Sequence, residues 1–99
     1  MKKNYEGKYC IVRGDRSGIF AGEVGERENQ NVIIRNCRRL WYWDGACSIS
    51  ELAVNGTARP KNCKFTVTVD EIELTDAIEI IPCTQRAEES IKGVKIWNY

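Results

Sequence analysis

Histidine is absent from this chain of 99 residues. Histidine is the most common general base and the usual activating partner of a serine or cysteine nucleophile. Its absence argues against triad hydrolysis, and we expect a binding protein that is not an enzyme. No apolar run approaches the ~18 residues that a membrane helix requires, so we also expect no membrane partner.

The sequence also lacks a C-x-x-C pair, although it contains five cysteines: Cys10, Cys37, Cys47, Cys63 and Cys83. Such a pair commonly organises a zinc or iron–sulfur site, so we expect no metal and no cofactor. The count is odd, and Met1, Lys2 and Lys3 precede polar residues and not an apolar signal segment. These features predict reduced thiols and a cytoplasmic protein.

Neither sign of charge is in excess, because the sequence has 15 lysines and arginines and 14 acidic residues, for a net charge of +1. A long nucleic-acid backbone is therefore a poor partner. No linker, repeat or low-complexity tract divides the chain, which predicts a single domain over residues 1–99. A domain of this size buries only about two thirds of the surface that its unfolded chain exposes, so we expect a homo-oligomer to supplement the thin core.

Apolar, β-favouring segments occupy residues 8–13, 19–27, 32–43, 64–70 and 77–83. Turn-forming residues follow the first segment, and Asn36 interrupts the alternation of the third, which predicts a bulge there. Strict alternation makes residues 64–70 the clearest strand. The apolar positions change parity after it, so a turn or bulge is expected near Asp70 and Glu71.

Two segments carry helix signals. Ser48 and Glu51 have the spacing of a capping box, and Gly56 can end the short helix that they predict. Thr84 can cap a second helical stretch through Ile91, followed by an extended tail. The whole pattern predicts a mainly β (α+β) fold: a small, strongly bent antiparallel sheet or an SH3-like barrel with one short inserted helix and a C-terminal helical turn.

Residues 38–43, RRLWYW, bring two guanidinium groups and three aromatic rings together. In an extended strand, side chains alternate, so one face carries Arg39, Trp41 and Trp43 and the other carries Arg38, Leu40 and Tyr42. Rings can stack on a base while arginine pairs with anionic oxygens. This chemistry suits a small anionic nucleotide-like ligand.

Core packing is the more common role for a large aromatic residue such as Trp41. Binding is the stronger interpretation for Arg38, Arg39 and Trp43, the last of which adjoins a turn. Two lysines downstream could close a pocket across a subunit boundary. The predicted ligand-binding residues are Arg38, Arg39, Trp41, Tyr42, Trp43, Lys61 and Lys64.

Five carboxylates gather in ten residues: Asp70, Glu71, Glu73, Asp76 and Glu79. A solvated strand edge that charge protects from aggregation is the common explanation. The alternatives are a surface that binds a host protein, or a divalent-metal site acting on a nucleotide. Cys47 and Tyr42 could act as catalytic groups only with an activating base, and the sequence has no histidine to supply one.

Several stretches resemble a family of small accessory proteins encoded by tailed phages and prophages. They are residues 38–56, beginning RRLWYWDGACS, the Arg59-Pro60 pair, the Cys63–Phe65 stretch, and AIEIIPCT at residues 77–84. Cys47 departs from this pattern, in which a small residue such as alanine is expected. The resemblance implies action in an infected bacterial host, either by sequestering a nucleotide-derived immune signal or by blocking a host effector.

The leading hypothesis is therefore a phage accessory protein of counter-defence type that sequesters a small phosphorylated nucleotide-derived signal without cleaving it. The alternative is a protein-interaction module that inhibits a host defence effector or a DNA-processing enzyme through the acidic strand.

Overall fold

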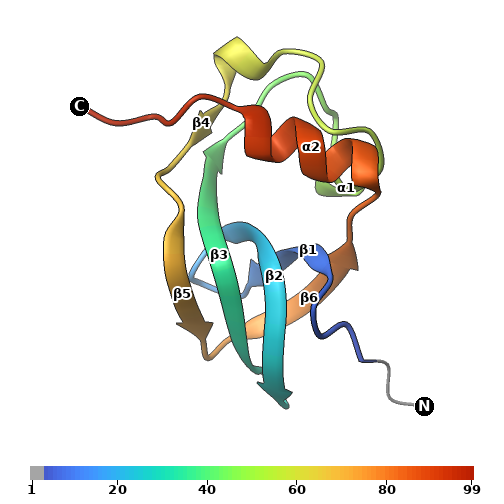
Figure 1. Ribbon diagram of the computed structural model, residues 1–99, viewed down its shortest axis with the longest axis vertical. Coiled ribbons are helices and arrows are strands. Elements are labelled where there is room, and N and C mark those ends of the chain that lie inside the picture. The colour runs from blue at the N-terminus through green and yellow to red at the C-terminus, as the bar shows by residue number, and fades with distance from the viewer. Residues whose placement is uncertain (1–3) are drawn as a thin grey trace.

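The computed structural model describes residues 4–99, so expectations for residues 1–3 lie outside the described part. Figure 1 shows a curled sheet with two helices packed together at one end. The strands are β1 (Tyr9–Gly14), β2 (Ile19–Glu28), β3 (Asn31–Tyr42), β4 (Lys64–Phe65), β5 (Val69–Leu74) and β6 (Ala77–Pro82). The helices are α1 (Ile49–Asn55) and α2 (Gln85–Gly93), with a 3-10 turn, η1, at Pro60–Asn62.

The strands form one antiparallel sheet in the order β4-β3-β2-β1-β6, with β5 also paired to β3. The sheet bends strongly but does not close on itself, because β5 and β6 end it on opposite sides. The predicted mainly β fold is confirmed, in its bent-sheet form and not as a closed barrel.

Both faces of the sheet carry a buried apolar cluster. On the helix side, Ile11 and Leu40 of the sheet pack with Leu52 of α1 and Ile91 of α2. On the concave side, the curled sheet buries a second cluster against itself: Cys10, Val12, Phe20, Val24, Val32, Ile34, Cys37, Leu74 and Ala77. Helices cover one side of the sheet, and the curl of the sheet covers the other. This small domain therefore buries two apolar clusters.

The predicted helix caps are confirmed. The Ser48 hydroxyl accepts a hydrogen bond from the Glu51 amide at 3.1 Å, and Gly56 ends α1 with φ of 73°. Thr84 caps α2 by accepting from the Ala87 amide at 3.1 Å. These side chains satisfy amides that the first helical turn leaves unpaired, so the local sequence fixes where each helix begins.

The expected continuous strand over residues 64–70 is wrong. β4 ends at Phe65, and β5 begins only at Val69. Thr66 is held instead by β3: its amide donates to the Arg39 carbonyl at 3.0 Å, and its hydroxyl accepts from the Arg39 amide at 2.9 Å. The break therefore lies at residues 66–68, and β5 runs through Asp70 and Glu71 without the predicted irregularity.

The bulge predicted at Asn36 is confirmed. Asn36 has φ of 49°, and the pairing of β2 with β3 shifts register between Ala21 and Glu23. Gly22 lies opposite, where an added Cβ would come within 2.7 Å of Ile34 Cγ2. Only glycine allows the two strands to approach so closely there, which explains the residue type.

Candidate ligand-binding site

Arg38, a predicted phosphate-binding residue, lies in the interior with 3% of its surface exposed. Its guanidinium donates to the carbonyls of Thr66, Ile91 and Val94 at 2.9 Å each and to that of Phe65 at 3.1 Å. Two of these carbonyls lie at the C-terminal end of α2, where the helix dipole favours a cation. This geometry corrects the prediction, because these donors join the helix end to the sheet and do not face a ligand.

Arg39 does reach the surface. Its guanidinium lies 4.5 Å from the centre of the Phe20 ring and donates to the Ser17 carbonyl at 2.7 Å. It lines a groove of about 190 Å³ together with Trp41, Trp43 and the turn between β1 and β2. A cation thus stands at the edge of a small groove with aromatic walls.

Trp41 is exposed to 63%, which corrects the expectation that it packs in the core. The pairing of β3 with β4 aligns Leu40 with Phe65 and Tyr42 with Lys64, so Trp41 is the extra residue of a bulge. Bulges re-aim side chains next to functional sites. Arg39 lies over Phe20 of the concave cluster, whereas the bulge leaves the Trp41 indole turned outward.

A second indole from the C-terminal tail lies against Trp41. The centroids of the Trp41 and Trp97 rings are 6.3 Å apart and their planes differ by 14°. Trp97, 45% exposed, is anchored by its amide, which donates to the Phe65 carbonyl at 2.9 Å. The Lys64 ammonium lies 5.5 Å from the centre of the Trp97 ring. We call Trp41, Trp97 and Lys64 the aromatic face.

The other predicted ligand-binding residues lie around this face in different ways. Tyr42 is 52% exposed at the end of β3. Trp43 is half-buried: it packs on the helix-side cluster and also lines the groove beside Arg39. Lys61 is exposed in η1, and within residues 4–99 it has no cation–π contact of the kind that Lys64 makes.

The sequence interpretation missed Trp97. A cavity of about 410 Å³ beside it is lined by Thr66, Trp97, Asn98 and Tyr99. The two indoles meet because the tail bridges to β4, with Ile96 paired to Phe65. The available signal was a tryptophan in a tail that has no helix or strand pattern. Its neighbour, Trp41, is evident only from the fold.

The five carboxylates do not lie together in one group. Asp76 caps the turn between β1 and β2: it accepts from the Arg16 amide at 2.8 Å and from the Ser17 amide and hydroxyl at 3.0 and 2.7 Å. These hydrogen bonds lower the pKa of Asp76. Glu79 pairs with Arg13 at 2.9 Å.

The other three carboxylates lie on β5, which forms an edge of the sheet. Glu71 lies 3.5 Å from Arg35, and Asp70 and Glu73 are exposed. The three residues of β5 are therefore the more exposed part of the acidic set.

The thiols differ in exposure. Burial raises the pKa of Cys10 to about 11 and those of Cys37 and Cys83 to about 12, so these thiols stay protonated near neutral pH. Cys47 is exposed just before α1. In residues 4–99, no group of three or more cysteine or acidic side chains could hold a metal ion. The helices of this part of the chain are too short or too polar to cross a membrane.

The fold and the aromatic face define a class of protein: a small bent-sheet domain with an exposed pair of indoles and a flanking cation. A family model described as a domain of unknown function (DUF6948) matches residues 7–91, so the chain belongs to this family. The match includes Arg39, Trp41 and Lys64 but ends before Trp97. No curated protein matches the chain.

Proposed function

We propose that this protein is a non-catalytic binding protein that captures a small phosphorylated nucleotide-like ligand without cleaving it. The base stacks on the aromatic face. The phosphate pairs with the Lys64 ammonium, which lies beside Trp97, and the Arg39 guanidinium adds positive charge from the groove that it lines with Trp41.

The exposure of two neighbouring indoles carries this proposal. Large aromatic rings are usually mostly buried, because exposed apolar surface costs about 25 cal/mol per Å². Trp41 and Trp97 are nevertheless exposed to 63% and 45% and are held nearly parallel. A preordered stacking surface of this kind contributes about 1–3 kcal/mol per base, and a flanking cation adds attraction for phosphate.

The residues near this face support binding and not turnover. Lys64 and Arg39 are cations that can neutralise phosphate, and the sequence contains no histidine to act as a base. The resemblance of residues 38–56 to small phage and prophage proteins supplies the biological setting of the proposal. In that setting the ligand is a nucleotide-derived immune signal in the cytoplasm of an infected bacterium.

The test is a calorimetric titration with cyclic di-GMP, ADP-ribose and AMP. We expect Trp41→Ala to weaken binding of the preferred ligand by about ten-fold, since 1.4 kcal/mol corresponds to a factor of ten. Lys64→Gln should also weaken binding, whereas the matched variant Lys61→Gln should not. Failure of every nucleotide to bind the wild-type protein, or equal binding by Trp41→Ala, would contradict the proposal.

A second candidate function is inhibition of a host protein through β5. The observation that favours it is that this edge strand carries three exposed carboxylates, Asp70, Glu71 and Glu73. Reversing these three charges should abolish capture of such a partner and leave nucleotide binding unchanged. Capture that survives the reversal would remove this candidate.

A further inference from the structure

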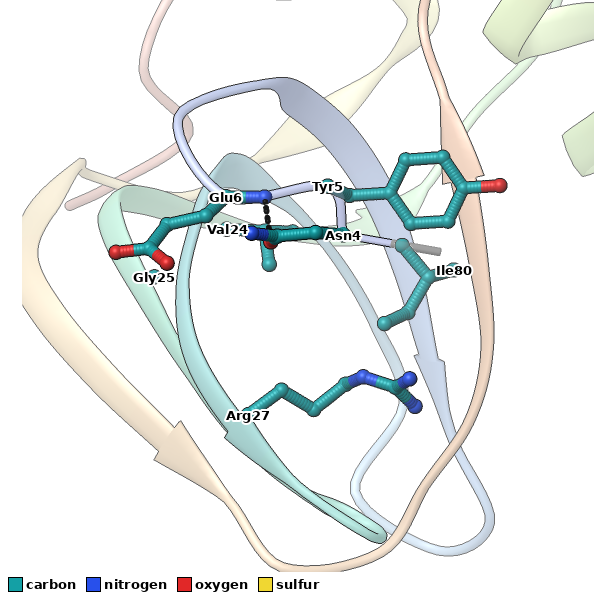
Figure 2. Close-up of a pocket in the computed structure, with 7 residues that line it drawn as sticks. All are labelled: Asn4, Tyr5, Glu6, Val24, Gly25, Arg27 and Ile80. Carbon is teal, nitrogen blue, oxygen red and sulfur yellow. Dashed lines mark hydrogen bonds between the residues drawn. The ribbon is translucent and has the colours of Figure 1, made fainter. Parts of the chain in front are cut away.

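A separate cavity of about 300 Å³ opens at the other end of the curled sheet (Figure 2). It lies among the N-terminal segment, β2 and β6, and its lining residues are Asn4, Tyr5, Glu6, Val24, Gly25, Arg27 and Ile80. Arg27 pairs with Val32 near the start of β3, whereas Trp41 lies nine residues further along. At about 3.3 Å per strand residue, these two positions are separated by about 30 Å along β3.

A bulge in β2 brings Arg27 into this cavity. Val24 pairs with Ile34 and Arg27 pairs with Val32, so two residues of β2 face one residue of β3 between these pairs. Directly paired residues share a face of the sheet. Val32 and Val24 both belong to the buried concave cluster, and the bulge therefore places Arg27 on that concave side, at its open end.

Arg27 differs from Arg13 and Arg35, two other arginines of the sheet, because it lacks a carboxylate partner in the described part of the chain. Arg13 pairs with Glu79 at 2.9 Å, and Arg35 pairs with Glu26 at 2.8 Å. Within residues 4–99, Arg27 has no carboxylate within ion-pair distance. Figure 2 shows its side chain extending across the cavity, while the Glu6 carboxylate points away from it.

The remaining walls are mixed: Tyr5, Val24 and Ile80 offer aromatic or apolar surface, and Asn4 and Glu6 are polar. Tyr5 and Ile80 pack on the concave cluster and also line the cavity (Figure 2). Small-ligand sites commonly combine an apolar wall with one charged group that fixes orientation. A guanidinium pairs best with a planar carboxylate, through two parallel hydrogen bonds.

We infer that this cavity is a second binding site, for a small organic carboxylate with an apolar or aromatic body. The carboxylate pairs with Arg27, and the body packs against Tyr5 and Ile80. A ligand bound here joins the N-terminal segment to β2 and β6 at the open end of the sheet. The site depends on none of the residues of the aromatic face.

The test is a nuclear magnetic resonance titration of the full chain with benzoate, acetate and benzyl alcohol. Benzoate should cause saturable shifts at the amides of Tyr5, Val24 and Ile80. Acetate, which lacks the apolar body, and benzyl alcohol, which lacks the carboxylate, should bind more weakly. Arg27→Gln should weaken benzoate binding by about ten-fold, the value of a charged hydrogen bond, whereas the control Arg86→Gln on α2 should leave it unchanged.

The inference is overturned if benzoate causes no saturable shifts, if the shifts lie only around Trp41, or if Arg27→Gln binds benzoate as the wild type does. The melting temperature of each variant, measured in parallel, shows that it is folded. A nucleotide titration of the same Arg27→Gln sample separates the two proposals: it should bind nucleotide normally, so either site can fail without the other.

Discussion

Replacing Arg38 by methionine tests the most unusual interior contact of this fold. Methionine fills most of the volume of the aliphatic stem but removes the guanidinium and its four hydrogen bonds to carbonyls. At about 1.5 kcal/mol for each bond to a charged group, these bonds contribute about 6 kcal/mol. The variant no longer buries a charge, and the loss of this desolvation cost offsets about 2–3 kcal/mol. The net loss of unfolding free energy is then about 3–4 kcal/mol.

The size of this loss depends on whether each carbonyl that loses the guanidinium keeps another hydrogen-bond donor. The Ile91 carbonyl retains the Val94 amide, and the Phe65 carbonyl retains the Trp97 amide. The Val94 carbonyl loses a donor inside the buried contact between α2 and the sheet. Burial also lowers the pKa of Arg38, which is consistent with a costly charge that its hydrogen bonds must offset.

The assay is urea unfolding followed by circular dichroism, with Arg38→Lys and Arg39→Met as comparisons. A loss of 3 kcal/mol lowers the melting temperature by about 12 °C or more in a domain of this size. We expect Arg38→Lys to be destabilised as well, because one ammonium cannot reach four carbonyls, and Arg39→Met to lose less. A loss below about 1 kcal/mol for Arg38→Met would refute the reasoning.

Three further predictions concern the rest of the fold. Hydrogen bonds hold the pKa of Asp76 below its ordinary value of 3.8, so its stabilisation is present at neutral pH and is lost as pH falls through the folded pKa. Asp76→Asn should therefore be less stable at pH 7 and lose less stability between about pH 5 and pH 2 in acid titrations. Gly22→Ala should destabilise the protein by about 1–3 kcal/mol in urea unfolding, because its Cβ would lie 2.7 Å from a side chain of β3. Iodoacetamide should label Cys47 first in the native protein, as mass spectrometry can show, and equally rapid labelling of Cys10 or Cys37 would contradict their burial.

The parts of the fold that depend on local signals could be predicted from the sequence. Ser48 and Thr84 cap helices through hydrogen bonds three residues away, and Asn36 adopts the backbone angles that asparagine tolerates. Such interactions involve only near neighbours in the chain. The helix starts, the bulge of β3 and the bent antiparallel sheet follow from them and from the alternation of apolar residues.

The candidate site could be predicted only in part, because its geometry depends on distant segments. Arg38 is buried since the end of α2, more than fifty residues later, supplies carbonyl partners. Trp41 is exposed because the pairing of β3 with the short β4 leaves it as an extra residue. Trp97 reaches it only through the tail's bridge to β4. Periodicity within one strand contains none of this information.

The aromatic face is the central claim, and native mass spectrometry of protein purified from bacteria with active defence systems tests it most directly. We predict a retained small molecule with the mass of a nucleotide derivative, released intact on heating, and its loss from Trp41→Ala purified in the same way. The same spectrum reports whether the expected homo-oligomer forms. Wild-type protein that carries no small molecule from such cells, or a Trp41→Ala variant that retains it, would contradict the account.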